Sequence, residues 1–494
     1  MNNYVIKKHT WLFLLAFLFI PSIMPSCAFP FSKSDKTGHV SLNMWHHYLG
    51  EQKIVFDKYI EEFNKTVGLE KNIAIKAYSM DNSGDIHNKI IQSANGEPGA
   101  PDMPDMATVY PGTAYTLYGM GKVVSVEKYM DTSKTAKYVD SFLEEGRLTS
   151  DSGIIIFPIA KSTELLYVNN TVYMKFLQEH NEKNPPNRLD ESMLNTFEGI
   201  LKTAEAYYDW TDAKTPDTAN DGTALFGFDA ASNFAVVGCR QLSNDFFSTN
   251  GRSGTINLGS PAFSKLWDYY HIPMARGYFG AYSYYRSEDV QTGDLVMFAG
   301  STAGAKFFPK TITYKDNTKL DIDLKVLPYP VFENGRKTSV QQGAGVAIMK
   351  STQEKEKASA IFLEWFTDPR RNTEFVLKTG YLPVTKEAID SILPEELEKL
   401  KNYPEYTNVL KVIKQALEMM KTYELYTYKP FENSDEMRFA FEDKFLSAAK
   451  ASRSDFLKDY EATKNLDTAF KNIARKDKYE RFIGEVRNEI LKTD

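Results

Sequence analysis

The segment at residues 341–388 constrains the fold more than any other part of the chain, because its local signals set a definite order of elements. Gly343 opens a short apolar run that ends at Met349 and suits a buried strand. Ser351 and Glu354 then have the spacing of a capping box, in which each side chain satisfies a free backbone amide at a helix start. The segment therefore predicts a buried strand followed directly by a capped helix.

The predicted helix has one apolar face and a defined end. The apolar residues recur at i, i+3, i+4 and i+7: Ala358, Ile361, Phe362 and Trp365. Pro369 cannot donate to a helix ladder and disfavours helix at the residue before it, so the helix should end there. A second helix is expected over residues 370–378, and Gly380 should stop it before an extended GYLPV segment.

The first part of the chain alternates between strand and helix patterns. Strands are expected at 39–45, 73–78 and 105–110, and helices at 54–65, 89–94 and 114–120. This rhythm predicts a parallel sheet with helices on its faces. Ligands of open α/β sheets bind beyond the carboxyl ends of the strands, which makes Trp45, Tyr48 and Tyr110 candidate binding residues.

The order of a Gly-rich strand, a helix ending in FLEWFTDP, a second helix and KTGYLPVT closely resembles extracellular solute-binding proteins of ABC importers, family 1. Within that family it is most similar to the sugar and glycerol-3-phosphate binders. The stretches WHHY, PDMATVYPGTA, IIIFPIAKSTELLYVNN and GDLVMFAGSTAGAKF agree with the same family. The resemblance implies an α/β fold of the two-lobed periplasmic-binding-protein type (type II). Each lobe would be a mostly parallel sheet flanked by helices, with three hinge crossings and a helical C-terminal extension.

The resemblance also implies a division of the chain. Lobe 1 would comprise residues 39–163 and 329–367, and lobe 2 residues 164–328 and 368–494. The crossings would lie at 154–170, at 321–330 and in the GYLPVTK segment. A small solute would draw the lobes together by hinge closure, and the permease subunits of the importer would be the protein partner.

The family comparison points to further ligand-contacting positions, which are Tyr78, Ser162, Thr163, Ser301, Gly343 and Tyr381. Ser301 has a second reading, as the cap of its own helix. Two departures weaken a glycerol-phosphate assignment. Pro111 follows VY where the family has an acidic residue, and residues 423–429 contain no Arg where the family has one that meets the phosphate. An oligosaccharide or another polyol therefore stays open as the solute.

The amino terminus has the features of an export signal. Lys7 and Lys8 precede an apolar run at 11–20, too short to span a bilayer with ease, so residues 1–26 are expected to be a signal peptide. Cys27 follows Ser26 as in a relaxed lipobox, which predicts a lipoprotein whose acylated Cys27 anchors the protein to the membrane, with a tether over 27–38. The alternative is an ordinary secretory signal with an incidental Cys. Either reading places the protein outside the cytoplasm, in the periplasm or at the cell surface.

Other functional classes find little support. The formal net charge is −6 and no basic stripe is visible, which argues against nucleic acid as a partner. Neither the adjacent His46 and His47 nor the Asp81 loop has a good metal-ligand pattern, so no metal, cofactor or catalytic residue is expected. Cys239 should be a buried small residue, and Glu145 a solvated helix carboxylate. A surface glycan-degrading enzyme or an adhesin on the same scaffold is the alternative.

Overall fold

The computed structural model describes residues 38–80, 83–343 and 345–491. The expected signal peptide at 1–26, the predicted lipidation site Cys27 and Asp81, whose loop lacks a good metal-ligand pattern, lie outside these residues. All elements described below belong to one compact unit, Val40–Asp494.

A six-stranded sheet is built mainly from the first part of the chain. Its strands are β1 (Val40–His46), β2 (Ile73–Ser79), β3 (Met106–Val109), β4 (Val123–Val124), β5 (Ile156–Phe157) and β15 (Gly345–Met349). The order is β2-β1-β3-β15-β4, and β5 also pairs with β15. β1 pairs in parallel with β2 and β3, whereas β15 is antiparallel to β3, β4 and β5. The sheet is therefore mixed, because β15 returns to it from a distant part of the chain and enters in the opposite direction.

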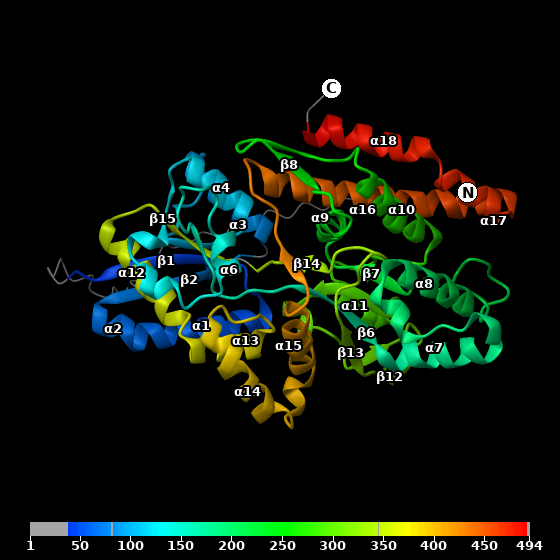
Figure 1. Cartoon of the computed structure of the whole chain (residues 1–494), viewed down its shortest axis with the longest axis horizontal. Helices are drawn as coiled ribbons and strands as arrows, with labels where there is room; N and C mark the ends of the chain where they lie inside the picture. Colours follow the sequence, from blue (N-terminus) through cyan, green and yellow to red (C-terminus); the bar gives the residue numbers. More distant parts are fainter. Residues whose placement is uncertain (1–37, 81–82, 344, 492–494) are drawn as a thin grey trace, which may run out of the picture. The chain divides into compact units, whose positions relative to one another are not determined.

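Helices cover both faces of this sheet, which Figure 1 shows around β1 and β2. One face packs against α1 (Gly50–Lys65) and α12 (Gln353–Phe366), through the rings of Phe56, Phe63, Phe362 and Phe366. The other face packs against α3 (Ser83–Asn95) and α4 (Pro111–Gly119), through Ile90 and Leu117. Successive side chains of a β-strand point to opposite faces of the sheet. Leu42 and Met44 of β1 therefore pack in one core and Trp45 packs in the other.

A second, four-stranded sheet has the order β13-β6-β10-β7. Its strands are β6 (Glu164–Asn169), β7 (Phe226–Phe228), β10 (Met297–Ser301) and β13 (Leu324–Leu327). β10 is parallel to β7 but antiparallel to β6, and β13 is antiparallel to β6. The expectation of mostly parallel sheets is thus wrong for this sheet too. Its helices include α7 (Asn170–Lys183), α8 (Phe197–Asp212), α9 (Ala231–Gln241) and α10 (Pro261–Arg276).

The last part of the chain is helical, as expected. It contains α14 (Leu393–Leu400), α15 (Thr407–Met420), α16 (Ser434–Thr463), α17 (Leu466–Ile473) and α18 (Lys476–Val486). α16 is one continuous helix of 30 residues that lies beside α10 (Figure 1). Phe445 of α16 is fully buried, and its ring stacks on Tyr270 of α10 with 4.2 Å between centroids. This helix therefore belongs to the core of the second sheet.

Three segments that connect the two sheets run side by side. Lys161 and Leu382 exchange two backbone hydrogen bonds of 3.0 and 2.6 Å, and Ser162 and Gln342 exchange two of 2.8 and 3.0 Å. The crossing expected at 321–330 lies later in the chain, because β13 belongs to the four-stranded sheet and the chain joins the other sheet at Gly345. β14 (Thr338–Val340) and β16 (Glu424–Tyr426) pair with each other along this route.

The residues around α12 mostly follow the expected signals. The cap of α12 is Thr352 rather than Ser351, and its hydroxyl accepts a hydrogen bond from the Lys355 amide. The carboxylate of Glu356, not Glu354, accepts the Ser351 amide at 3.0 Å. α12 ends before the proline, and α13 (Pro369–Thr379) stops at Gly380 in the left-handed conformation, as predicted.

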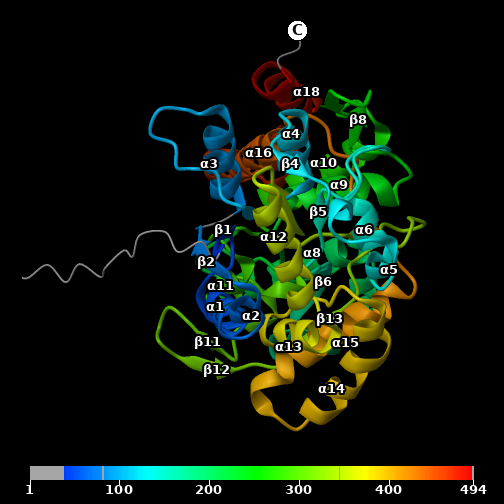
Figure 2. The same cartoon turned by 90° about the vertical axis from the view of Figure 1, so that its left-hand side faces the viewer.

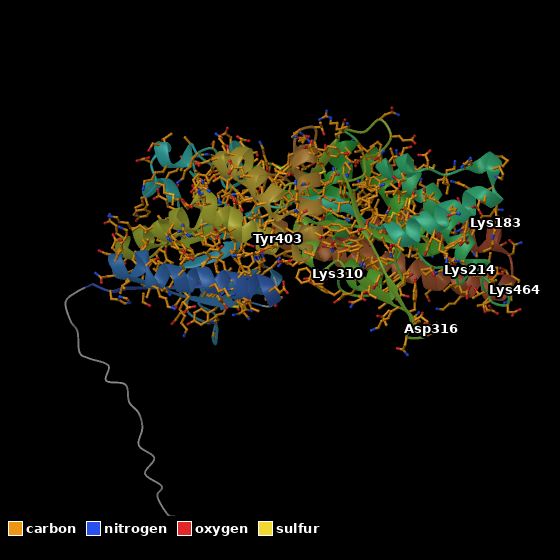
Figure 3. All side chains as sticks on the ribbon, turned by 90° about the horizontal axis from the view of Figure 1, so that it is seen from below. Lys183, Lys214, Lys310, Asp316, Tyr403 and Lys464 are labelled. Carbon is orange, nitrogen blue, oxygen red and sulfur yellow. The ribbon has the colours of Figure 1, made fainter. Side chains whose placement is uncertain are left out.

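Helix α13 contributes to the cores of both sheets. Phe375 and Val376 pack in the core of the six-stranded sheet, while Leu377 packs in that of the four-stranded sheet. The predicted lobe boundary at residue 368 thus precedes a helix that contacts both halves. Farther out, the hairpin of β11 (Thr311–Thr313) and β12 (Lys319–Asp321) carries Asp316 at its exposed tip (Figure 3). Among the described residues, no helix combines the length and apolar character needed to cross a bilayer.

We expect Phe445→Ala to lower the free energy of unfolding by about 3–5 kcal/mol, because it leaves a cavity between α16 and α10. Phe307→Ala is the matched control, since Phe307 is 54% exposed and its loss should change stability by about 0.5 kcal/mol or less. Urea denaturation followed by circular dichroism measures both. Equal stability of the two variants would show that α16 is not part of the core.

Candidate functional site

A buried ion pair lies where the crossing segments meet. The Lys161 ammonium is 2.7 Å from the Glu145 carboxylate and donates to the carbonyl of Gly343 at 2.9 Å. The Gln341 amide also donates to Glu145, at 2.6 Å. Both charged side chains are under 10% exposed, so the expectation that Glu145 is solvated is wrong. Its partner Lys161 is 16 residues away and belongs to another element, which a local pattern cannot reveal.

Gly343 is required at this point by its backbone conformation and by its neighbours. Its φ is +97°, which side chains disfavour. A Cβ there would lie 2.8 Å from the Ala160 carbonyl and 3.0 Å from Cα of Lys161. The second and first crossing segments can therefore approach this closely only with glycine at position 343.

A chain of polar side chains continues from the crossings into the second half of the molecule. The Asn233 amide, on α9, donates to the Glu164 carboxyl at 2.6 Å and to the Gln342 side chain at 3.0 Å. The Arg438 guanidinium, from α16, donates to the side-chain oxygen of Asn233 at 3.1 Å. The Arg438 side chain also lies 6.0 Å from the centre of the Tyr110 ring. Four separate elements thus converge on one polar cluster.

Burial controls the charge of two carboxyl groups beside this cluster. Burial raises the pKa of Glu164 to about 8, although the hydrogen bond from Asn233 opposes the shift. Burial likewise raises the pKa of Asp229 to about 6, against a hydrogen bond from the backbone of Arg286. At neutral pH Glu164 is therefore mainly an uncharged acid, which can donate as well as accept a hydrogen bond.

The start of α16 makes a second connection to the six-stranded half, where α4 and α16 lie side by side in Figure 2. The Asp435 carboxylate accepts hydrogen bonds from the Thr113 amide at 2.8 Å and the Thr113 hydroxyl at 3.0 Å. It thereby caps α4, whose own N-cap residue provides no side-chain cap to the helix. The imidazole of His87 lies 3.0 Å from the Glu436 carboxylate.

A small cavity lies between these two connections. Its volume is about 50 Å³. The lining residues come from both halves of the molecule and from the crossings: Tyr110, Pro111, Glu145, Asn233, Val236, Val340, Gln341, Gln342, Thr427, Tyr428, Asp435 and Arg438. The cavity is thus much smaller than the sites of about 300–1,000 Å³ that hold small molecules.

Three further tyrosine side chains lie near Tyr110, which lines the cavity. The rings of Tyr48 and Tyr381 meet edge to face, with centroids 5.9 Å apart. Burial raises the pKa of Tyr381 well above its usual range, and the nearby hydroxyls of Tyr48, Tyr110 and Tyr285 add to the shift. Four phenol groups from four different segments are therefore neighbours.

The structure places the other predicted aromatic residues apart from this group. Trp45 is 5% exposed and packs with Ile90 and Leu117 in the core next to α3 and α4. Tyr78 is 37% exposed at the end of the edge strand β2, where the Lys76 ammonium lies 5.0 Å from the centre of its ring. The surroundings of Trp45 are therefore those of a core residue.

The predicted small polar residues lie at or near the crossings. Ser162 is buried and pairs with Gln342, while the Thr163 hydroxyl bonds to that of Ser339 at 3.0 Å. The Ser301 hydroxyl accepts from the Ala303 amide at 3.2 Å and so caps a short helix of its own, η4 (Thr302–Lys306). The capping role of Ser301 is thus what the structure shows.

Sequence reasoning missed Asn233, Gln342, Arg438 and Tyr285. Each is an ordinary polar residue of a helix or loop, and only the fold brings it to the site. The expectation for Cys239 is confirmed, because the side chain is fully buried and burial raises the pKa of its thiol to about 12. Burial also lowers the pKa of His46 to about 4, where its ring packs on Phe56.

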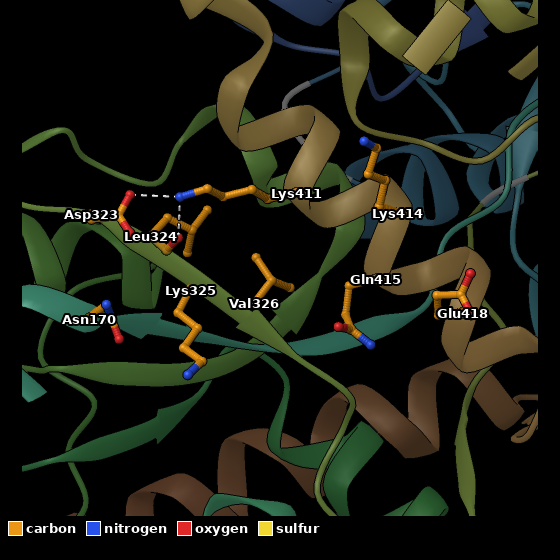
Figure 4. A pocket seen from close by; sticks show the side chains of 9 residues that line it. All are labelled: Asn170, Asp323, Leu324, Lys325, Val326, Lys411, Lys414, Gln415 and Glu418. Carbon is orange, nitrogen blue, oxygen red and sulfur yellow. Dashed lines mark hydrogen bonds and ion pairs between the residues drawn. The ribbon is translucent and has the colours of Figure 1, made fainter. Parts of the chain in front are cut away.

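Larger grooves exist elsewhere on the surface. Figure 4 shows one of about 440 Å³ between β13 and α15, where the Lys411 ammonium contacts Asp323 at 2.6 Å. Another, of about 750 Å³, lies between α7 and α8 around Trp210. Neither is lined by a predicted binding residue or by residues of the first sheet. A third groove, of about 670 Å³, shares Glu145, Gln341, Thr427 and Tyr428 with the small cavity, so the crossings are the better candidate site.

Comparison with protein families gives one match over most of the chain. Residues 58–408 match the family described as bacterial extracellular solute-binding protein. A comparison with curated proteins finds no match.

Solved structures share the fold at low sequence identity. The cyclic α-maltosyl-1,6-maltose binding protein of Arthrobacter globiformis is 15% identical, with a TM-score of 0.62 over 91% of this chain and 99% of that one. UgpB of Mycobacterium tuberculosis, in complex with glycerophosphocholine, is 16% identical, with a TM-score of 0.58 over 91% and 99%. A maltotriose binding protein of Thermus thermophilus is 16% identical, with a TM-score of 0.55 over 91% and 100%. These likenesses show the two-lobed binding-protein fold.

The raised pKa of Glu164 predicts a pH effect on stability. The pKa is about 8 in the folded protein and about 4.3 in an unfolded chain. Between these values the folded state holds a proton that the unfolded state has lost, so stability falls as pH rises, by about 1.4 kcal/mol per pH unit at most. Glu164→Gln keeps an oxygen for Asn233 and removes the titration, so its Tm should fall less between pH 5 and pH 8.

The control for this experiment is Glu354→Gln, which alters an exposed carboxylate at the start of α12. Differential scanning calorimetry over the pH series measures all three proteins. The same pH slope in wild type and Glu164→Gln would contradict the assignment of a raised pKa to Glu164.

Proposed function

Because this chain belongs to the bacterial extracellular solute-binding protein family, we propose that it captures a neutral carbohydrate or polyol at the crossing segments and delivers it to the membrane permease of an ABC importer. The observation that supports the solute site is the cavity at the crossings, whose lining comes from both halves of the molecule. Hydrogen-bonding side chains from Asn233, Gln342 and Arg438 are already fixed by mutual contacts, as a site for a hydroxyl-rich molecule requires.

Capture requires the halves to separate. Binding sites for small molecules have volumes of about 300–1,000 Å³, whereas this cavity has about 50 Å³. The proposed hinge consists of the three crossing segments and Gly380. The predicted lobes, 39–163 with 329–367 and 164–328 with 368–494, are adjusted so that residues 329–340 join the second lobe, because Tyr329, Phe332 and Val340 pack in the core of the four-stranded sheet. A solute that contacts both lobes only in the closed state shifts the equilibrium toward closure. The permease would then recognise the closed form.

The charges around the cavity favour a neutral solute over a phosphate. Lys161 is already paired with Glu145. Arg438 is the cation among the lining residues. Burial opposes its charge, but the neighbouring Tyr428, Asp435 and Glu442 raise its pKa. A glycerophosphodiester is the second candidate, because Arg438 offers the guanidinium that residues 423–429 lack.

We propose Tyr48, Tyr110, Ser162, Gly343 and Tyr381 as the predicted residues that the solute meets, with Asn233, Gln342 and Arg438 added from the structure. Trp45, Tyr78, Thr163 and Ser301 are the predicted residues whose surroundings support a solute contact less. The proposal includes no catalytic residue.

Solute binding should raise the melting temperature of the mature protein in a screen of sugars, polyols and glycerophosphodiesters. For the best solute, Tyr381→Phe should weaken binding by about 1 kcal/mol, or roughly fivefold, because one hydroxyl hydrogen bond is lost without a cavity. Titration calorimetry gives the dissociation constants. Tyr403→Phe is the control, since Tyr403 (Figure 3) is 53% exposed and lies outside the proposed site.

Three results of this experiment would change the assignment. Full affinity in Tyr381→Phe would show that the site is misplaced. If the protein releases cleavage products from glycans added to the same screen, a surface glycan-degrading enzyme is favoured. A wild-type protein that no solute stabilises would favour an adhesin.

We further propose that Cys27 carries the lipid anchor in the membrane and that residues 1–26 are removed. Acyl chains contribute about 0.8 kcal/mol for each methylene buried in the membrane. Wild-type protein made in bacteria should therefore enter the detergent phase of a Triton X-114 separation, and Cys27→Ala should remain in the aqueous phase. If the wild type also remains in the aqueous phase, the ordinary secretory signal is correct.

A further inference from the structure

A histidine of the half that contains the six-stranded sheet contacts the start of α16 in the other half. His87 lies on α3, which packs on α4, and α4 lies beside α16 (Figure 2). His87 is 5% exposed. Its Nε2 atom is 3.0 Å from the Glu436 carboxylate of α16, and its Nδ1 atom is 2.8 Å from the hydroxyl of Thr113 on α4. This ring therefore links the two halves at a place outside the crossing segments.

The hydrogen bonds around Asp435 fix the direction in which the Thr113 hydroxyl donates. The Asp435 carboxylate accepts from the Thr113 amide at 2.8 Å, the Thr113 hydroxyl at 3.0 Å and the Tyr428 hydroxyl at 2.9 Å. Three donors aimed at two oxygens suit an ionised carboxylate, which only accepts hydrogen bonds. Because a threonine hydroxyl has one proton and Thr113 donates it to Asp435, the same oxygen can only accept from His87.

These directions require both ring nitrogens of His87 to carry a proton. Nδ1 must donate to the Thr113 hydroxyl, and Nε2 must donate to the Glu436 carboxylate. A neutral imidazole has one N–H group, whereas a charged imidazole has two. The arrangement of the two halves in this structure is therefore one that a charged His87 satisfies and a neutral His87 does not.

The imidazole faces two carboxylates from the opposite half. Among the described residues, α16 presents Glu436 and Asp435 to the ring. α4 presents the hydroxyl of Thr113, and the strands beneath α3 belong to an apolar core. On α3 itself Asp85 and Lys89 are each two residues away, and side chains at that spacing on a helix do not face each other.

The pKa values of the two partners shift in the directions expected of an ion pair. Burial lowers the pKa of His87, but the hydrogen bond and charge of Glu436 and the charge of Asp435 outweigh burial, so that the pKa of His87 is raised. Burial raises the pKa of Glu436, but the hydrogen bond and charge of His87 outweigh it, and the pKa of Glu436 is lowered. Both carboxylates belong to the opposite half, so the charge of His87 loses this stabilisation when the halves separate.

We propose that His87, Thr113, Asp435 and Glu436 form a proton-dependent latch, which holds the two halves together while the imidazole is charged and weakens when the imidazole loses its proton. The proposal rests on the separation of the halves that the proposed function requires, but it needs no solute.

The direction of the pH effect follows from the two states. Separation removes the carboxylates, so the open form binds the proton of His87 less tightly than the closed form, and closure takes up a proton. The closed form is therefore less favoured as pH rises from about 6.5, the ordinary value for histidine, through the raised pKa of His87. A solute held only in the closed form would be bound more tightly at mildly acidic pH and released more readily in alkaline surroundings.

The Thr113 amide reports on the latch, because its hydrogen-bond acceptor, Asp435, lies in the opposite half. Hydrogen–deuterium exchange of this amide is measured at single-residue resolution in the mature protein without solute, as the ratio of intrinsic to observed exchange rate. From pH 6 to pH 8.5 this protection should fall about fivefold or more in the wild type, and by no more than about tenfold per pH unit, the limit for one proton. Small-angle X-ray scattering of the same samples should show a larger radius of gyration as the protection falls.

Two variants isolate the contribution of the latch. His87→Gln keeps an N–H donor but cannot become charged, so it should lose most of the pH dependence. The part that remains is assigned to Glu164, whose pKa is about 8. Glu436→Gln keeps His87 but removes the carboxylate that stabilises its charge, and it should also lose most of the pH dependence. The Glu436 side chain is 39% exposed, so this second variant leaves the core intact.

His180→Gln is the matched control, because His180 of α7 contacts the Asn187 carbonyl within its own half, at 3.3 Å, and its loss should leave the pH dependence unchanged. Equal pH dependence in the wild type and in His87→Gln overturns the latch, and so does a Thr113 amide that is unprotected at every pH. Either result leaves the solute screen unaffected. A screen in which no solute binds would contradict the proposed function and leave the exchange result in place, so the two failures are distinguishable.

Discussion

The backbone pairing of the crossing segments is the constraint on which the rest of the structure depends. Lys161 with Leu382 and Ser162 with Gln342 join three remote parts of the chain in one narrow place. A buried ion pair is costly to desolvate, and that of Lys161 with Glu145 is offset by further hydrogen bonds from Gln341 and to Gly343. These contacts fix the position of the residues that follow each crossing, and those residues form the candidate site.

A second set of contacts joins the halves at some distance from the crossings. Asp435 caps α4 from another helix, and a Cβ at Gly112 would lie 2.6 Å from the carboxyl carbon of Asp435. A helix start that relies on a carboxylate from the opposite half is satisfied only while the halves are together. The capped α4 therefore stabilises the arrangement seen here in addition to any contact that a solute provides.

Local signals predicted the elements well where one residue decides the outcome. Pro369 ended α12, Gly380 ended α13, and the alternating pattern located β1 and β2 to within a residue or two. The sequence pattern predicted Ser351 as the cap of α12, whereas the structure has Thr352 there. Both residues carry a hydroxyl group, so the pattern does not distinguish them. The family resemblance, rather than periodicity, supplied the two-lobed fold.

Properties that depend on distant partners were not predictable in this way. The direction of β15 depends on where the chain re-enters the sheet, and the burial of Glu145 depends on Lys161. Arg438 reaches the site from a helix whose start is positioned by α4 and α9. These residues carry no local pattern that separates them from solvent-exposed neighbours.

The small volume of the cavity has a kinetic consequence for the proposed function. If the solute binds there, a sugar cannot enter a space of about 50 Å³, so each capture event would wait for the protein to open. At low solute concentration the observed rate rises with concentration, but at high concentration it levels off at the rate of opening. The rate at which the hinge opens would then set the maximum rate of solute uptake, whatever the abundance of solute outside the cell.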